Sequence, residues 1–164
     1  MRIEKIQADK KHYLALLLLG DEQESMIDRY LERGDMYALF DDDPKSICVV
    51  TRESEDIYEI KNIATWPPYQ GKGYGKALIR HILEKYSPYA SAMLVGTGNV
   101  PGILAFYKSC GFIYSHTIPR FFTGHYPNPV YEDGIRLVDM VYLKKSFPQI
   151  KTRDIDMTRV LICP

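Results

Sequence analysis

The chain has 164 residues, of which 46% are hydrophobic and 26% charged, and this composition predicts one folded domain rather than a disordered chain. Lysine and arginine together number 21, as do aspartate and glutamate, so the formal net charge is zero and the basic surplus of a nucleic-acid-binding protein is missing. The longest apolar run, residues 13–19, is far too short to cross a bilayer, and the first residues lack a signal-peptide pattern. We therefore expect a cytoplasmic protein with neither a nucleic-acid nor a membrane partner.

The charges are unevenly divided between the two halves of the chain. Residues 1–60 carry 15 acidic and 8 basic side chains, whereas residues 61–164 carry 6 acidic and 13 basic ones. This asymmetry indicates that the two halves face ligands of opposite charge. The three cysteines, Cys48, Cys110 and Cys163, are too few and too scattered for a disulfide framework or a zinc site, so we expect no metal.

The first half of the chain predicts a strand, two helices and three further strands. In chain order these are residues 2–7, 12–19, 21–33, 35–40, 46–51 and 57–65. The last three are separated by acidic and proline-containing turns, which is typical of an antiparallel meander.

The second half alternates helices and strands, so some of its strands should be parallel. The predicted elements are a helix at 73–86, a strand at 90–95, a helix at 101–110, a strand at 112–117, a loop at 118–134 and a strand at 135–143. Residues 158–163 could add one more strand. The fold class predicted is α/β, with a mixed sheet flanked by helices.

A glycine-rich segment, Gln70-Gly71-Lys72-Gly73-Tyr74-Gly75, joins a predicted strand to a predicted helix. Its glycines leave backbone N–H groups uncovered at a helix N-terminus, which favours an anion, and the two lysines at 72 and 76 add positive charge. The spacing fits neither the dinucleotide fingerprint nor the phosphate loop of nucleotide-binding proteins. We expect a pyrophosphate site, although a glycine-rich turn without a ligand is the alternative.

Two stretches resemble a known family. Residues 62–75, with Gln70 and the glycines that follow, resemble the acetyl-CoA motif of the GNAT superfamily of N-acetyltransferases. Asn99 with residues 105–112 is similar to that family's next motif, although the spacing of eight from Asn99 to Tyr107 is one longer than the commonest form. The resemblance covers residues 1–145 as one domain and leaves 146–164 as a tail. It implies a sheet splayed at its centre, with acetyl-CoA as co-substrate between two parallel strands.

The resemblance also implies the residues that hold acetyl-CoA. The strand before the glycine segment would present backbone groups to the pantetheine arm and the acetyl carbonyl, and the glycine segment would bind the diphosphate. Asn99 would bond the pantetheine, unless it is a simple turn or cap residue. The cofactor-binding residues implied are Ile63, Ala64, Thr65, Gln70, Gly71, Lys72, Gly73, Tyr74, Gly75, Lys76, Asn99 and Tyr107.

Two residues are candidates for proton transfer. Tyr107 matches the family's general acid, because a phenol with a pKa of about 10 stays protonated and can give its proton to the leaving thiolate. Its alternative is aromatic packing between helix and sheet. Glu59, eleven residues before Gln70, is the candidate base, and its alternative is a strand carboxylate that faces solvent or pairs with Lys61 on the same side. Cys110 ends a predicted helix, where a thiolate is disfavoured, so we expect direct attack in a ternary complex.

The function implied is transfer of acetyl from acetyl-CoA to a primary amine of a small molecule or peptide. The alternative is a non-catalytic acyl-CoA-binding module with a regulatory or interaction role. The aromatic segment 121–126 is expected near the acceptor site or an interface, and Glu132 and Asp133 could attract a cation. The tail at 146–164 could supply an added strand or a dimer contact, so a homodimer is a further expectation. The identity of the amine stays open.

Overall fold

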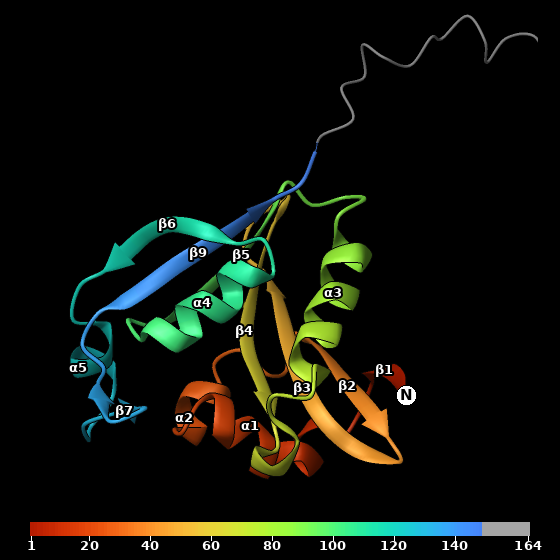
Figure 1. Ribbon diagram of the computed structural model, residues 1–164, viewed down its shortest axis with the longest axis horizontal. Helices are drawn as coiled ribbons and strands as arrows, with labels where there is room; N and C mark the ends of the chain where they lie inside the picture. Colours follow the sequence, from red (N-terminus) through yellow and green to blue (C-terminus); the bar gives the residue numbers. More distant parts are fainter. Residues whose placement is uncertain (149–164) are drawn as a thin grey trace, which may run out of the picture.

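The computed structural model describes residues 1–148, which form a seven-stranded sheet with helices on both faces (Figure 1). The strands are β1 (Arg2–Ile6), β2 (Asp35–Asp41), β3 (Asp43–Arg52), β4 (Ile57–Thr65), β5 (Ala92–Gly98), β6 (Ile113–Ile118), β7 (Tyr131–Glu132), β8 (Ile135–Arg136) and β9 (Met140–Ser146). The helices are η1 (Lys10–Tyr13), α1 (Leu14–Gly20), α2 (Glu24–Ile27), η2 (Pro67–Tyr69), α3 (Tyr74–Tyr86), α4 (Pro101–Ser109) and α5 (Phe121–His125). The predicted mixed α/β class is confirmed.

The sheet has the strand order β1-β2-β3-β4-β5-β9-β6, and β7 pairs with β8 in a separate hairpin. Every neighbouring pair is antiparallel except β4 and β5, which are parallel. The antiparallel meander of the first half is therefore confirmed, as is a parallel pair involving the second half. None of the helices within residues 1–148 is long and apolar enough to cross a membrane.

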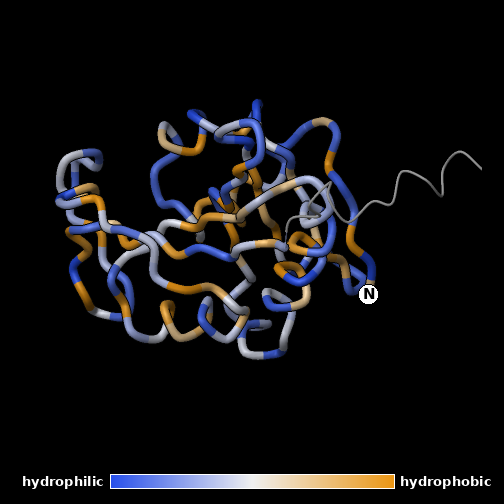
Figure 2. The backbone as a smooth tube through the Cα atoms, turned by 90° about the horizontal axis from the view of Figure 1, so that it is seen from above, coloured by the Kyte–Doolittle hydropathy of each residue, from blue (hydrophilic) through white to orange (hydrophobic). Residues whose placement is uncertain are grey.

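Two apolar layers hold the helices to the sheet. On one face, α3 and α4 pack through residues such as Leu78, Ile82 and Tyr107 against the inner strands. On the other face, α1 and the turns after it pack Leu17 and Leu31 against β2, β3 and the end of β4. Hydrophobic segments gather in the interior in Figure 2, while many of the connections are hydrophilic. Burial of these faces supplies the main driving force for folding.

The central parallel pair parts halfway along its length. Pairing of β4 with β5 runs only from Ile57–Ala92 to Ile60–Val95, although β4 continues to Thr65. At the same point the register of β4 against β3 shifts, because Val50 pairs with Ile60 whereas Val49 pairs with Asn62. Lys61 is the extra residue of a β-bulge, and a bulge bends its strand. The expected splay between the two parallel strands is thus present.

The helix predicted at 21–33 is wrong. Helix α2 covers only Glu24–Ile27, and single turns follow, with Tyr30 N–H bonded to the Ile27 carbonyl at 3.1 Å. The Lys10 ammonium donates to the Leu31 carbonyl at 2.8 Å and to the Gly34 carbonyl at 2.7 Å, which are carbonyls at and beyond the last turn of the predicted helix, where no intrahelical N–H is available. These turns bury the same apolar side chains that a helix would.

The region predicted as a loop at 118–134 and a strand at 135–143 also differs. It contains α5 and the β7–β8 hairpin, and the long strand β9 begins only at Met140. Asp133 and Gly134 form the hairpin turn with φ of 49° and 75°, the backbone shape that favours an Asp-Gly pair. Ile135 and Arg136 pair within this hairpin and therefore do not join the main sheet. The strand predicted at 158–163 lies outside the described residues.

Candidate active site

A cavity of about 1000 Å³ opens where β4 and β5 part. Its walls come from the second half of β4, the end of β5, the glycine segment, the first turns of α3 and α4, the α1–α2 connection and the segment from α5 to β9. In Figure 1, β4 runs toward α1 and α2, whereas β9 starts near α5 and β7 and runs away from them. The cavity therefore lies between elements from both halves of the chain.

The glycine segment forms one end of the cavity, at the start of α3. Gly71 and Gly73 have φ of 75° and 87°, in the left-handed region that favours glycine, and Gly73 precedes the first residue of α3. No side chain caps α3, so its first backbone N–H groups remain available to an anion. Gln70 Nε2 donates to the Thr65 carbonyl at 3.0 Å, which fastens the segment to the end of β4. This geometry suits a diphosphate.

The predicted cofactor residues fall into two groups. Those that line the cavity are Ile63, Ala64, Thr65, Gln70, Gly71, Gly73, Tyr74, Gly75, Lys76 and Tyr107. Lys72 and Asn99 are exposed and do not line it, and the Lys72 ammonium lies 5.5 Å from the centre of the Tyr69 ring. Tyr74 donates from its hydroxyl to Asp41 Oδ2 at 2.5 Å, which ties the start of α3 to the β2–β3 turn.

The second half of β4 presents one free edge to the cavity. Ile63 pairs with Cys48 and Ala64 pairs with Ile47 of β3, so the β3 side of the strand is fully used. On the β5 side, pairing within the described residues stops at Ile60. The backbone groups on that edge can receive an extended ligand as an additional strand would be received. A pantetheine arm has this extended, amide-bearing shape.

Tyr107 stands inside the cavity with its hydroxyl free. Its side chain is 7% exposed and packs against Phe106 and Phe112, and within residues 1–148 its hydroxyl makes no hydrogen bond. Burial raises the pKa of Tyr107 above the ordinary value of 10.0, so the phenol is protonated at neutral pH. A protonated, unpaired phenol at this position can act as a proton donor.

Glu59 lies on β4 but does not line the cavity. Its carboxylate is buried and forms an ion pair with Lys61, which in turn lies 3.5 Å from Glu53. The Glu59 carboxylate also helps burial to raise the pKa of Tyr142 on β9. The pairing with Lys61 is therefore observed, and the base role of Glu59 stays a prediction.

The two cysteines within the described residues are unpaired. Cys110 is not a cavity residue, and burial raises the pKa of its thiol despite the nearby Lys76 and Arg80. Among residues 1–148, no group of three or more histidine, cysteine, aspartate or glutamate side chains could hold a metal ion.

The far end of the cavity was predicted from the sequence only in part. There Asn62 Nδ2 donates to the Leu17 carbonyl at 2.9 Å and to the Tyr30 hydroxyl at 3.1 Å. The Tyr30 hydroxyl donates to Asp21 at 3.4 Å, and the Tyr126 hydroxyl donates to the same carboxylate at 2.9 Å. These residues are scattered along the chain, and no local spacing connects them. The available signals were the aromatic segment 121–126, of which Phe122 and Tyr126 line the cavity, and the acidic character of Glu132 and Asp133, which also line it.

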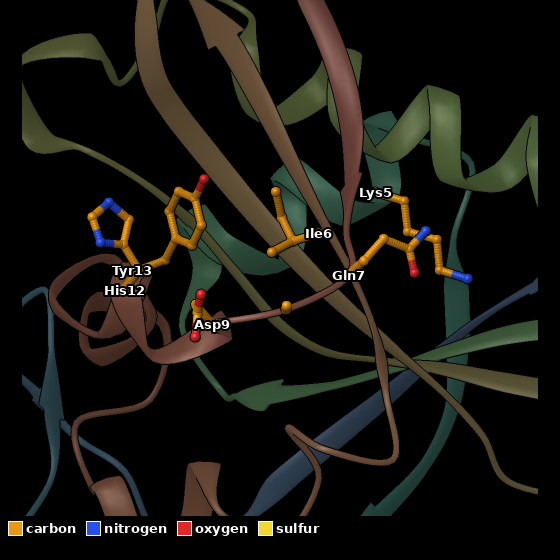
Figure 3. Close-up of a pocket in the computed structure, with 7 residues that line it drawn as sticks. Lys5, Ile6, Gln7, Asp9, His12 and Tyr13 are labelled. Atoms are coloured by element: carbon orange, nitrogen blue, oxygen red, sulfur yellow. The ribbon is translucent and has the colours of Figure 1, made fainter.

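A second, more open depression of about 460 Å³ lies between the end of β1 and η1 (Figure 3). In this view His12 and Tyr13 lie at one end and Lys5 and Gln7 at the other. All of its lining comes from one continuous stretch, residues 5–13, and none of the glycine segment or the splayed strands contributes. The large cavity is therefore the candidate active site.

Known proteins are similar to the chain in both fold and sequence. The Acetyltransferase (GNAT) domain model matches residues 32–114. A curated relative, the uncharacterized N-acetyltransferase YvbK of Bacillus subtilis (strain 168), is 35% identical over 146 residues, which cover 87% of this chain and 94% of the relative. The chain belongs to the GNAT family of acetyltransferases.

Two solved structures of relatives superpose well on the chain. A GNAT family acetyltransferase from Elizabethkingia anophelis, with acetyl-CoA bound, is 30% identical and has a TM-score of 0.84 over 89% of this chain and 97% of that one. A Bacillus subtilis acetyltransferase in complex with CoA is 34% identical and has a TM-score of 0.83 over 90% of this chain and 99% of that one. The resemblance inferred from the two motifs is confirmed.

Proposed function

We propose that this protein transfers acetyl from acetyl-CoA to a primary amine by direct attack in a ternary complex. The observation that carries the proposal is the parting of β4 and β5 after Ile60 and Val95, with a cavity that joins an anion-binding helix start to a buried phenol. The relatives crystallised with acetyl-CoA and CoA support the choice of co-substrate.

The residues present fit such a co-substrate. The uncapped N–H groups of α3 and Lys76 would hold the diphosphate, and there is nothing within 4 Å of where a side chain would start on Gly71 or Gly73. The free edge formed by Ile63, Ala64 and Thr65 would hold the pantetheine arm and orient the thioester carbonyl. A backbone N–H from this edge would also stabilise the oxyanion that develops during attack.

Acetyl transfer requires two proton movements besides the oxyanion contact. The amine must lose its proton before it attacks, because a lysine-like amine has a pKa of about 10.4. Glu59 is our candidate to accept this proton. The leaving thiolate is stabilised by a proton, and Tyr107 is our candidate to donate it, because it lines the cavity and its hydroxyl makes no hydrogen bond within residues 1–148.

Direct attack is favoured over an acetyl-enzyme. The best-placed thiol near the cavity, Cys110, does not line it and has a raised pKa from burial, so little thiolate is present at neutral pH. The order of events would then be binding of both substrates, attack, and release of the acetylated amine and CoA.

The experiment is CoA-thiol release from acetyl-CoA with a panel of primary amines, with mass detection of each product. We expect an acetylated amine and initial-rate lines that intersect when both substrates are varied. Acetyl-CoA binding without turnover of any amine would support the non-catalytic acyl-CoA-binding module instead. Parallel lines together with an acetylated cysteine would contradict direct attack.

A further inference from the structure

The acceptor end of the cavity is strongly acidic. Asp21 and Glu22 reach it from the α1–α2 connection, and Glu132 and Asp133 reach it from β7 and its turn. Among the described residues that line the cavity, the only cationic ones are Lys61 and Lys76. Four carboxylates and two ammonium groups therefore line the cavity, and within residues 1–148 neither ammonium forms an ion pair with any of the four.

Lys61 is paired with other carboxylates, and Lys76 lies at the start of α3. The Lys61 ammonium pairs with Glu59 and lies 3.5 Å from Glu53, and neither of these glutamates lines the cavity. Lys76 lies in the first turn of α3, at the end of the cavity suited to a diphosphate. The acidic end is left without a counter-charge from the described part of the chain.

The acidic residues come together from both halves of the protein. The Tyr126 hydroxyl, at the end of α5, donates to Asp21 at 2.9 Å. The pKa of Glu132 is raised by burial and by the charges of Asp133 and Glu22, which places all three within electrostatic reach of one another. The charge of Glu132 also raises the pKa of Tyr107, so this cluster lies near the proposed proton donor.

A buried acceptor atom marks the same end independently. Asn62 is 3% exposed, and its amide nitrogen is satisfied by the Leu17 carbonyl and the Tyr30 hydroxyl. Its Oδ1 has no hydrogen-bond partner within residues 1–148 and faces Gly20, another cavity residue. Buried polar atoms are nearly always paired in folded proteins, so an unused acceptor beside the acidic groups points to a ligand that donates hydrogen bonds.

The reacting nitrogen cannot supply the positive charge that the carboxylates at the acidic end would compensate. It must be neutral when it attacks the thioester, because a protonated amine has no lone pair to give. If the acceptor carried no other charge, the half-buried carboxylates of Asp21 and Glu132 would face a neutral substrate in the reacting complex. A second positive charge that remains protonated removes this conflict.

We propose that Asp21, Glu22, Glu132 and Asp133 form a subsite for a second ammonium group, so that the acceptor is a diamine or a longer polyamine rather than a monoamine. The inference rests on the proposed acetyltransferase function and names its substrate class. One amine end would enter toward Tyr107, and the other would stay protonated at the acidic end with Asn62 Oδ1 as a further acceptor.

The experiment compares three acceptors of equal chain length: 1,5-diaminopentane, pentylamine and 5-aminopentanoate. We expect kcat/KM for the diamine to exceed that for pentylamine by about tenfold or more, and that for the amino acid to be lowest. The double variant Glu22→Gln/Glu132→Gln should bring the diamine close to pentylamine. Neither side chain forms a hydrogen bond or an ion pair within residues 1–148, so the fold should tolerate it. The control is Glu55→Gln/Asp56→Asn, which removes the same charge from an exposed turn and should change nothing.

Binding provides a second readout. Calorimetric titration of the CoA-saturated protein with diaminopentane should show binding that weakens in the double variant and with added salt. Equal kcat/KM for diamine and pentylamine, or equal loss of both in the variant, would overturn the second-charge subsite while leaving the acetyltransferase function in place. Turnover of none of the three amines and no other amine would contradict the proposed function itself.

Discussion

The Tyr126 hydroxyl donates a 2.9 Å hydrogen bond to Asp21 Oδ1 across 105 positions of sequence. It joins the end of α5 to the connection after α1, two segments that approach the cavity from opposite halves of the chain. Within the described residues, this is the hydrogen bond that closes the acceptor end from side to side. It holds one carboxylate oxygen of Asp21 and leaves the rest of the acidic end open to substrate.

Tyr126→Phe should remove this bond with little loss of packing. We expect the free energy of unfolding to fall by about 1 kcal/mol, the usual net contribution of a hydrogen bond, and the KM of the amine to rise while the KM of acetyl-CoA stays the same. Chemical denaturation and two-substrate kinetics measure both. Tyr131→Phe, on an exposed tyrosine of β7, is the matched control. An increase in the KM of acetyl-CoA alone would place Tyr126 at the wrong end of the cavity.

Tyr107→Phe tests the proton donor. The hydroxyl makes no hydrogen bond within residues 1–148, so its removal should leave the melting temperature almost unchanged, whereas kcat should fall by roughly 10²-fold. Thermal unfolding and steady-state rates distinguish the two effects. Tyr114→Phe, on an exposed residue of β6, serves as the control. An unchanged kcat would leave Tyr107 with a packing role only.

Two glycine variants separate backbone strain from ligand contact. Gly73 has φ of 87°, so Gly73→Ala should cost about 1–2 kcal/mol of stability and weaken acetyl-CoA binding. Gly75→Ala should do neither, because a Cβ there would lie in ordinary contact, 3.5 Å from Thr65 Oγ1 and 3.6 Å from Phe106 Cζ. Denaturation curves and CoA titrations provide the measurements. Equal behaviour of the two variants would refute the conformational argument.

Glu59→Gln tests the candidate base. If Glu59 accepts the amine proton, kcat should fall by about 10²-fold and the pH profile of kcat/KM should change shape. Glu53→Gln is the control, since Glu53 also lies beside Lys61 but is farther from it. A pH profile identical to wild type, accompanied by lower stability, would assign Glu59 to holding Lys61 in place instead.

The raised pKa of Glu132 predicts a pH-dependent stability. Burial is the main cause, followed by the charges of Asp133 and Glu22. Because the folded protein binds this proton more tightly than the unfolded chain, ionised Glu132 costs stability at neutral pH, and the cost disappears as the pH falls to the ordinary value of 4.5. Glu132→Gln should therefore be more stable than wild type at pH 8 and equal to it at pH 4 in urea unfolding. A variant less stable than wild type at pH 8 would reverse the sign and contradict the assignment.

The anion-binding half of the site was predictable because its signal is local. Gln70, Gly71 and Gly73 lie within four positions. Both glycines adopt a positive φ, and Gln70 donates a hydrogen bond to the Thr65 carbonyl. The meander of β2, β3 and β4 was predictable for the same reason, because short stretches of sequence indicate its turns and its alternating strands.

The acceptor half could not be predicted in this way. Asp21, Asn62 and Tyr126 meet only after the sheet has formed, and their spacing along the chain carries no period. The helix predicted at 21–33 has real apolar spacing, since Ile27, Tyr30 and Leu31 are all buried. Single turns after α2 bury these side chains in place of a continuous helix, and Lys10, distant in sequence, donates to carbonyls at the end of the segment.

The bulge at Lys61 determines which side chains of β4 face each of the two helical layers. Before it, Ile60 packs on the α3–α4 side, and after it Ile63 packs on that side while Ala64 packs on the α1 side. Because of this one inserted residue, the α3–α4 layer is faced by even-numbered positions before the bulge and by odd-numbered positions after it. A deletion at position 61 would therefore leave Ile60 and Asn62 on the faces they occupy now, but it would remove the bulge and the bend of β4 at the point where β4 parts from β5, even though no functional side chain had been removed.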